Sequence, residues 1–296
     1  MRHYATAAPA WQACVLYESM KRHCRPFALH VLATDYEPIA DITAEDRQLI
    51  FTRGSDLVAR YPHLARLPGR PRNPNEYNCS VRWRWFADLA SAHGQIMAID
   101  GDMWFWSSPE ALWQELEVSP APWALTEHRF APAARGLQGV TQESHGKFGR
   151  FNGGWAWFRD PAPAIFMANH AEQWAYQGFL ELLDGRVIFG DQGWLALIDE
   201  IIPAHVIKNP GVNLAPWNLR ASCDGILAAE PGDPPRIFRR GPPWTFCDVV
   251  LYHYSSLKLD DAGEVIQYAD ASYAVPGAAK GPLYDPYIEE VRRVRR

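Results

Sequence analysis

The chain has 296 residues, of which 48% are hydrophobic, and its 29 basic and 34 acidic side chains give a formal net charge of −5. That hydrophobic content supports a sizeable core and argues against a disordered chain. The acidic excess argues against nucleic acid as the default partner. Since 18 uncharged apolar residues never occur together, we expect no transmembrane segment.

The cysteines and the two ends of the sequence bear on the compartment. Five scattered cysteines form neither a Cys-x-x-Cys motif nor a metal-ligand spacing, so we expect free thiols in a reducing compartment. Residues 1–23 do not resemble a signal peptide, and we therefore expect a cytoplasmic protein. The arginine-rich "YIEEVRRVRR" over 287–296 is interpreted as a solvated helix end, with weak contact to anionic lipid at the inner membrane face as the alternative.

The hydrophobic pattern predicts strands that alternate with helices along the first half of the chain. Strands are predicted over 3–6, 27–35 and 95–100, and helices over 10–23, 44–61, 80–94 and 108–117. Residues 67–78, rich in Pro, Arg and Asn, predict a loop, and the residues "MWFW" at 103–106 are expected to pack against the next helix. Beyond residue 120 the pattern is more irregular.

The alternation of strands and helices is typical of an α/β fold with a mostly parallel central sheet. We expect one domain whose first half carries the sheet. In such sheets ligands bind beyond the carboxyl ends of the strands. Asp35 and Asp100 both stand at such ends.

The stretch "IMAIDGDMWFW" over 96–106 places two aspartates directly after an apolar strand. Gly101 lets the chain turn, so that the carboxylates of Asp100 and Asp102 can converge on one side. Two such close carboxylates favour a cation between them, and oxygen ligands suit Mg²⁺ or Mn²⁺. We interpret the pair as a site for a metal ion that also binds phosphate oxygens; a pair of solvated turn aspartates is the alternative.

Two further stretches combine polar side chains with the start of a strand or helix. In "GRFNGGWAWFRD", Asn152 precedes two glycines, which allow either close backbone approach to a ligand or an ordinary turn. In "VIFGDQGWLALI", Asp191 and Gln192 stand at a predicted helix start. There Asp191 either caps the helix or, with Gln192, binds hydroxyl groups in a cleft.

The last two stretches contain side chains suited to sugar or metal binding. In "NPGVNLAPWNLR", the amides of Asn213 and Asn218 suit sugar hydroxyls, and the indole of Trp217 suits the face of a sugar ring. The stretch "VVLYHYSSLK" predicts a strand that ends at His253, five residues before Lys258. A histidine in this position is either structural or a ligand.

In this order, the five stretches resemble those of family 8-type glycosyltransferases and their bacterial relatives, which are nucleotide-diphospho-sugar transferases of the GT-A fold. The motifs that carry the resemblance are Asp-x-Asp at 100–102, "FNGG" at 151–154, "DQ" at 191–192, "NLAPWN" at 213–218 and "HY" at 253–254. The stretches "YESM" at 17–20 and "TEHRF" at 126–130 are also similar. The resemblance covers roughly residues 3–260.

The resemblance implies a single GT-A-like domain over 1–296. It would comprise a nucleotide-binding half over 1–106, an acceptor- and sugar-binding half over 107–260, and a C-terminal extension over 261–296. It further implies metal-dependent transfer of a sugar from a nucleotide-diphospho-sugar, with UDP as the expected nucleotide, to a hydroxyl of a glycan, glycolipid or other acceptor. Retention of configuration and a place in bacterial polysaccharide or lipopolysaccharide synthesis are also implied.

The resemblance also implies roles for individual residues. Asp100, Asp102 and His253 would hold Mn²⁺ or Mg²⁺. The catalytic group would comprise Asn152, Asp191 and Gln192. Besides the two metal-binding aspartates, the contacts to the nucleotide-sugar would come from Tyr4, Thr6, Trp11, Arg82, Gly101, Asn213, Trp217, Asn218 and Lys258.

Two departures from the family pattern keep other functions open. Where the family has an Asp or Asn that contacts the base, Ala8 and Trp11 stand. The last motif lacks its glycine, and Lys258 comes one residue early. A carbohydrate-binding protein without catalysis is therefore one alternative. A haloacid-dehalogenase-type phosphatase is another, although it expects Thr or Val where Met103 stands and the aspartate pair near the N-terminus.

Overall fold

The computed structural model describes most of the chain, and the statements below concern those residues. They are residues 1–33, 48–66, 74–130, 148–174, 180–183, 186–222, 224–227, 233–240, 243, 245–270, 273 and 275–295.

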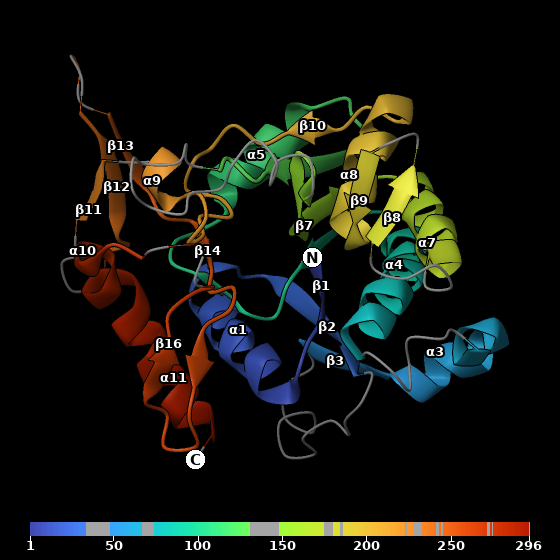
Figure 1. Ribbon diagram of the computed structural model, residues 1–296, viewed down its shortest axis with the longest axis horizontal. Coiled ribbons are helices and arrows are strands. Elements are labelled where there is room, and N and C mark those ends of the chain that lie inside the picture. Colours follow the sequence, from blue (N-terminus) through green and yellow to red (C-terminus); the bar gives the residue numbers. More distant parts are fainter. Residues whose placement is uncertain are drawn as a thin grey trace.

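A seven-stranded sheet forms the centre of the fold (Figure 1). Its strands, in spatial order, are β10 (His205–Val206), β6 (Trp123–Glu127), β7 (Phe151–Phe158), β4 (Ile96–Ile99), β1 (Arg2–Ala7), β2 (Phe27–Ala33) and β3 (Leu49–Arg53). The strand β7 runs antiparallel to both of its neighbours, whereas the other pairings in this sheet are parallel. The prediction of an α/β fold with a mostly parallel sheet is confirmed.

Helices cover both faces of this sheet because its strands are apolar on both sides. One face packs against α1 (Ala10–His23) and α5 (Glu110–Val118). The other face packs against α4 (Pro74–His93), α7 (Ala162–Trp174) and α8 (Gly190–Ile201). On β1, for example, Tyr4 lies in the first of these cores and Ala5 in the second. The result is a three-layer arrangement.

The remaining elements are short and lie mostly in the second half of the chain. The helices are α3 (Gly54–Arg60), α9 (Leu219–Ser222), α10 (Gly277–Ala279) and α11 (Asp285–Arg295). The strands are β5 (Met103–Phe105), β8 (Leu180–Leu183), β9 (Arg186–Phe189), β11 (Gly225–Leu227), β12 (Arg236–Arg239), β13 (Thr245–Asp248), β14 (Leu251–His253), β15 (Lys258–Leu259) and β16 (Val265–Gln267). Figure 1 shows α11 beside α1, and a third apolar core joins them to β14.

The predicted helix over 44–61 is wrong in its first part. Leu49–Arg53 forms β3, which extends the sheet by pairing with β2, and only Gly54–Arg60 is helical. The β-branched and aromatic residues of "LIFT" suit an edge strand, and the pairing with β2 outweighs the helical spacing. Residues 44–47 lie outside the described residues.

Three other boundaries differ from the prediction. The helix α4 starts at Pro74, so the predicted loop over 67–78 extends too far; proline is well tolerated in a first helical turn. The strand β2 ends at Ala33, and Asp35 lies outside the described residues. Residues 103–105 form β5, a strand that was not predicted and that pairs with β14, and Met103 and Phe105 share an apolar core with the next helix, α5, as expected.

The C-terminal arginines contact the protein itself. Arg292 pairs with Glu264 at 2.9 Å, and the guanidinium of Arg295 lies 4.3 Å from the centre of the Trp11 ring. Among the described residues no helix has the length and apolar character needed to span a membrane. The four described cysteines, Cys14, Cys24, Cys79 and Cys247, form no disulfide, and Cys223 lies outside the described residues.

Candidate active site

The pairing of β5 with β14 brings His253 to the aspartate pair. These strands are antiparallel, and His253 lies opposite Met103, next to Asp102 in the chain. The backbone N–H of Tyr254 also donates to the carbonyl oxygen of Asp102 at 2.8 Å. A contact between residues 151 positions apart therefore follows from one short strand pairing.

Asp100, Asp102 and His253 form a compact cluster at the carboxyl end of β4. Nε2 of His253 lies 3.1 Å from Oδ1 of Asp102 and 3.9 Å from Oδ2 of Asp100. One possible ligand atom from each residue lies within 4.8 Å of the other two. His253 is buried and both carboxylates are half-buried, so the cluster is held by the protein yet open on one side.

The charges in this cluster strongly influence one another. Burial raises the pKa of Asp100 against the opposing charges of Arg82 and His253. Burial also acts on Asp102, but the charge and hydrogen bond of His253 outweigh it and lower the pKa of Asp102. Although burial alone would lower the pKa of His253, Asp102 and Asp100 together raise it.

Arg82 joins this cluster to the start of α8. From α4 its Nη1 donates to Oδ1 of Asp100 at 2.9 Å, and its Nη2 forms an ion pair with Asp191. The same Nη2 donates to the carbonyl oxygen of Gly153 at 3.2 Å, and Nε1 of Trp83 donates to Asp191 at 3.1 Å. Two carboxylates, those of Asp100 and Asp191, therefore meet one arginine.

The two glycines of "FNGG" make room for these side chains. A Cβ at Gly154 would lie 2.6 Å from Cε1 of His253 and 2.8 Å from Oδ2 of Asp100, which is too close for any side chain. A Cβ at Gly153 would lie 3.3 Å from Oδ1 of Asp191. Gly154 also accepts a hydrogen bond from the backbone N–H of Asp100 at 2.8 Å. Because Gly154 has no Cβ, the side chains of Asp100 and His253 can lie against the backbone at this position.

Asn152 lies in a buried polar network beside the cluster. Its Oδ1 accepts from the N–H of Gly154 and from Nδ2 of Asn213, both at 3.0 Å. Nδ2 of Asn213 also donates to Oγ1 of Thr126 at 2.7 Å. His128 lies on the other side, with Nε2 3.5 Å from Nδ2 of Asn152. The amide of Asn152 is thus held by three neighbouring elements.

The amides in "NLAPWN" shape the loop itself. Oδ1 of Asn218 accepts from the N–H of Ala215 at 2.9 Å, and its Nδ2 donates to the carbonyl oxygen of Asn213 at 3.0 Å. Asn213 adopts φ 53°, a left-handed conformation that asparagine tolerates better than most residues. Trp217 packs edge-on against His253, with ring centres 5.1 Å apart. This loop therefore supports the candidate ligand His253.

The residues predicted to contact the nucleotide lie in different surroundings. Tyr4 is fully buried and its hydroxyl accepts from Nε1 of Trp113 at 3.0 Å, whereas Oγ1 of the buried Thr6 has no partner among the described residues. Trp11 is half-buried under Arg295. A Cβ at Gly101 would lie 2.1 Å from Cβ of Ala8, so close packing requires this glycine.

The last motif keeps a conformation that glycine normally supplies. Ser256 adopts φ 63° at the position where the family resemblance expects glycine. Lys258 is exposed on β15, which pairs with β16. Its predicted contact with a diphosphate stays a prediction.

Gln192 lies on the first turn of α8, beside the chain that carries the "FNGG" motif. A Cβ at Gly153 would lie 3.3 Å from Cβ of Gln192, so the two segments are in contact here. Since β7 and α8 bring "FNGG" and "DQ" together, the predicted catalytic group of Asn152, Asp191 and Gln192 converges around Gly153 and Gly154.

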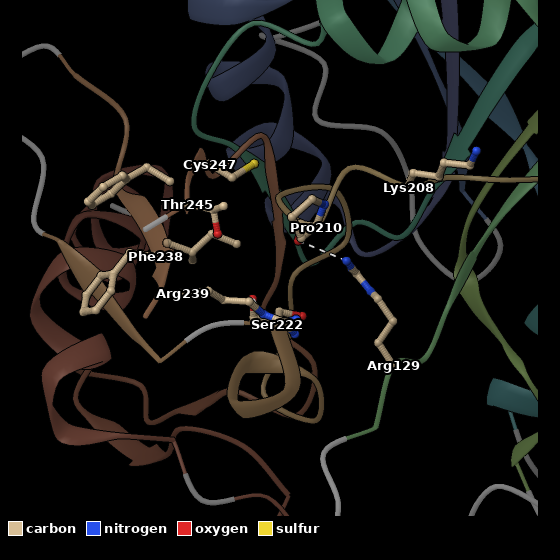
Figure 2. Close-up of a pocket in the computed structure, with 10 residues that line it drawn as sticks. Arg129, Lys208, Pro210, Ser222, Phe238, Arg239, Thr245 and Cys247 are labelled. Carbon is tan, nitrogen blue, oxygen red and sulfur yellow. Dashed lines mark hydrogen bonds between the residues drawn. The ribbon is translucent and has the colours of Figure 1, made fainter. Parts of the chain in front are cut away.

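A cavity of about 500 Å³ is lined by residues that include Arg129, Lys208, Pro210 and Arg239. Figure 2 shows Arg129 and Lys208 on one side of it and Arg239 on the other. Arg129 donates to the carbonyl oxygens of Pro210 at 3.1 Å, Val212 at 2.7 Å and Asn213 at 3.2 Å. One arginine thus links the cavity wall to the polar network around Asn152.

Sequence reasoning did not identify every residue that shapes the site. Trp83, which donates to Asp191, carries no recognisable motif, whereas Thr126, which accepts from Asn213, begins the "TEHRF" stretch. His128 belongs to the "TEHRF" stretch, whose similarity to the family was the signal available. Its Nδ1 lies 3.0 Å from the carbonyl oxygen of Gly149 and its ring stacks on Phe130.

No protein-family model and no curated protein matches the chain. Among solved structures, mouse xyloside xylosyltransferase 1 is similar to 85% of this chain and 97% of its own, at 14% identity and a TM-score of 0.49. The galactosyltransferase LgtC, solved with donor and acceptor sugar analogues, is similar to 98% of this chain and 95% of its own, at 12% identity and a TM-score of 0.49. A glycosyltransferase involved in glycosylation of the major capsid of PBCV-1 is similar to 86% of this chain and 93% of its own, at 9% identity and a TM-score of 0.44.

All three of these structural neighbours are glycosyltransferases. Because the identities are low, the geometry of the site itself has to support any conclusion about its chemistry.

Proposed function

We propose that this chain is a metal-dependent glycosyltransferase that moves a sugar from a nucleotide-diphospho-sugar, with UDP as the expected nucleotide, to a hydroxyl acceptor. The observation that supports this proposal is the convergence of Asp100, Asp102 and His253 beside the Arg82–Asp191 pair. Side chains from β4, β14, α4 and α8 meet there.

The donor set fits a hard divalent ion. Two carboxylates suit Mg²⁺ or Mn²⁺, and the imidazole of His253 favours Mn²⁺ over Mg²⁺, which prefers oxygen ligands. The absence of a Cβ at Gly154 gives the side chains of Asp100 and His253 room to converge. When bound by Asp100, Asp102 and His253, the ion would supply positive charge to the leaving diphosphate.

The residues of the chain set the geometry around the reacting sugar. Arg82 neutralises Asp100 and Asp191 together and so fixes the distance between the metal ligands and the start of α8. Asn152 is oriented by its hydrogen bonds to Gly154 and Asn213. Such preorganised dipoles hold a substrate without rearrangement during reaction.

Asp191 is poorly suited to act as a nucleophile. One of its oxygens accepts from both Arg82 and Trp83, which disperses its negative charge. This favours retention by internal return, in which the acceptor hydroxyl attacks from the face that the diphosphate leaves. NMR of the anomeric proton in the first product formed would distinguish retention from inversion.

The cavity in Figure 2 is our candidate for acceptor binding. Arg129 in its wall donates to the carbonyl oxygen of Asn213, and Arg129, Lys208 and Arg239 favour an acceptor that carries an anionic group. The substitution Lys208→Glu is then expected to raise the KM for such an acceptor severalfold while leaving metal-dependent donor hydrolysis unchanged. An equal effect on donor hydrolysis would contradict this assignment.

A screen of nucleotide-sugars tests the main proposal. Thermal unfolding is measured with UDP-, GDP- and other sugar donors, with and without Mn²⁺, because a ligand that binds the folded state raises its stability. Donors that stabilise the chain are then assayed for hydrolysis and transfer. A Mn²⁺-dependent turnover that Asp102→Asn abolishes is the expected result.

The alternatives give different outcomes in the same experiments. Glycan binding without turnover of any donor would indicate a carbohydrate-binding protein. Release of phosphate from a phosphomonoester, with no response to nucleotide-sugars, would indicate a phosphatase. The expectations of a single domain over 1–296 and of a cytoplasmic location, as well as a role in bacterial polysaccharide or lipopolysaccharide synthesis, remain part of this proposal.

A further inference from the structure

Three histidines from distant parts of the chain meet on the face of the sheet that α4 covers. His3 lies on β1 and His30 on β2, where the parallel register pairs His3 with Ala28 and His30 with Ala5. The two side chains are therefore diagonal neighbours on one face of the sheet. His93 is the last residue of α4 and completes the cluster.

The nitrogen atoms of these histidines are spaced as ligands of one metal ion. Nδ1 of His3 lies 3.1 Å from Nε2 of His30, and a ligand atom from each of the three lies within 4.8 Å of the others. Two imidazole nitrogens bound to one tetrahedral Zn²⁺, each about 2.0–2.1 Å from it, are separated by about 3.3 Å. The first two histidines are thus almost in position.

The third histidine needs only a side-chain rotation. The ring of His93 stacks on that of His3, with centres 4.0 Å apart and an interplanar angle of 13°. Stacked rings direct their in-plane lone pairs side by side, so His93 has to turn for its nitrogen to face the same ion. Because His93 is exposed, that rotation leaves the core undisturbed.

The electrostatic surroundings favour neutral imidazoles. Burial, together with the nearby His93 and His3, lowers the pKa of His30 to about 4. Burial and His93 likewise lower the pKa of His3. A metal ion binds the neutral imidazole, so little competition from protons is expected near neutral pH.

We propose that His3, His30 and His93 form a second metal site, for a borderline transition ion such as Zn²⁺, with water as the remaining ligand. Imidazole ligands suit Zn²⁺, Ni²⁺ and Cu²⁺, whereas the carboxylate cluster suits Mg²⁺ or Mn²⁺. By the strand register, His3 lies four residues, or roughly 13 Å, below Asp100 along the parallel strands. Such an ion would fasten β1 and β2 to the C-terminal end of α4, and the proposal does not depend on the proposed function.

The test is Zn²⁺ titration calorimetry on the full chain without a histidine tag, after removal of metal with a chelator. The Asp102→Asn variant serves as the parent, so that the carboxylate cluster contributes little. Adding His93→Gln or His3→Gln is expected to weaken Zn²⁺ binding at least tenfold. Adding His63→Gln, an exposed histidine paired with Glu172, is the matched control and should leave the affinity unchanged.

Co²⁺ supplies a second readout, since a four-coordinate site with three imidazoles absorbs strongly in the visible range. This absorption should be present in the Asp102→Asn parent and absent after His93→Gln. The proposal is overturned if Zn²⁺ binding is lost in Asp102→Asn alone, or if His93→Gln leaves both the Zn²⁺ affinity and the Co²⁺ spectrum unchanged. Because His93 is exposed, its substitution tests the site even if His3→Gln fails to fold.

Discussion

Replacing Arg82 with methionine should destabilise the chain far more than an ordinary surface substitution. Arg82 is buried and binds the carboxylates of Asp100 and Asp191. Methionine retains much of the apolar stem but leaves both carboxylates without their cation. Removing one partner from a buried ion pair typically costs about 3–5 kcal/mol, so we expect Arg82→Met to lower the free energy of unfolding by that amount.

A matched control comes from the surface of the same protein. Arg60 pairs with Asp88 at 2.7 Å, but Arg60 is exposed and Asp88 also accepts from the hydroxyl of Tyr61. Exposed pairs contribute about 1 kcal/mol at most, so Arg60→Met should have a small effect. The assay is urea unfolding at pH 7 in the presence of a metal chelator, with free energies extrapolated to water.

A double variant separates charge from packing. If the unpaired carboxylates cause the loss, Arg82→Met combined with Asp191→Asn should recover part of the stability of the single variant. If Arg82→Met loses no more stability than Arg60→Met, the reasoning about this junction is refuted. Equal stability of the single and double variants would refute the charge explanation and leave only packing.

The remaining predictions concern the metal cluster and the pH dependence of stability. Gly154→Ala should weaken Mn²⁺ binding in calorimetry at least tenfold, because its Cβ would lie within 3 Å of the candidate ligands Asp100 and His253. The control Gly277→Ala, with open space around its Cβ, should leave the Mn²⁺ affinity unchanged. Unchanged Mn²⁺ binding in Gly154→Ala would contradict the candidate metal site. Asp102→Ala should abolish Mn²⁺-dependent UDP binding. His253→Ala should weaken this binding less, because two carboxylates remain. Equal Mn²⁺ affinity with and without His253→Ala would show that His253 is not a metal ligand. With metal removed, the free energy of unfolding should fall as the pH decreases from 6.5 to about 4, because the unfolded chain protonates His30 in this window and the folded chain does not. This contribution is at most about 3 kcal/mol. Urea unfolding of a His30→Gln variant should lack this pH-dependent loss of stability.

Much of the local structure is predictable from the sequence. The helix over 10–23 and the strand before Asp100 follow from apolar spacing, and Gly94 ends α4 in the left-handed conformation that favours glycine. The edge strand β3 was missed because its five residues fit a helical pattern equally well. Pairing with β2 decides such cases, and a single segment does not reveal its partner.

The role of Gly101 shows how a correct expectation can rest on an incomplete reason. The sequence suggests conformational freedom between the two aspartates. The structure adds that a Cβ at this position would collide with Ala8. The glycine is therefore required by packing between two segments that lie far apart in the chain.

The sequence by itself determined the alternation of strands and helices, the burial of the central strands and the position of the aspartate pair after one of them. These properties depend on residues that are close together in the chain, so the spacing of apolar and polar residues along the sequence indicates them. Only the tertiary structure decided that His253 lies beside Asp102, that Arg82 binds Asp191, and that three histidines meet at the end of α4. Those contacts depend on strand order and helix packing, which bring together residues that lie far apart in the chain.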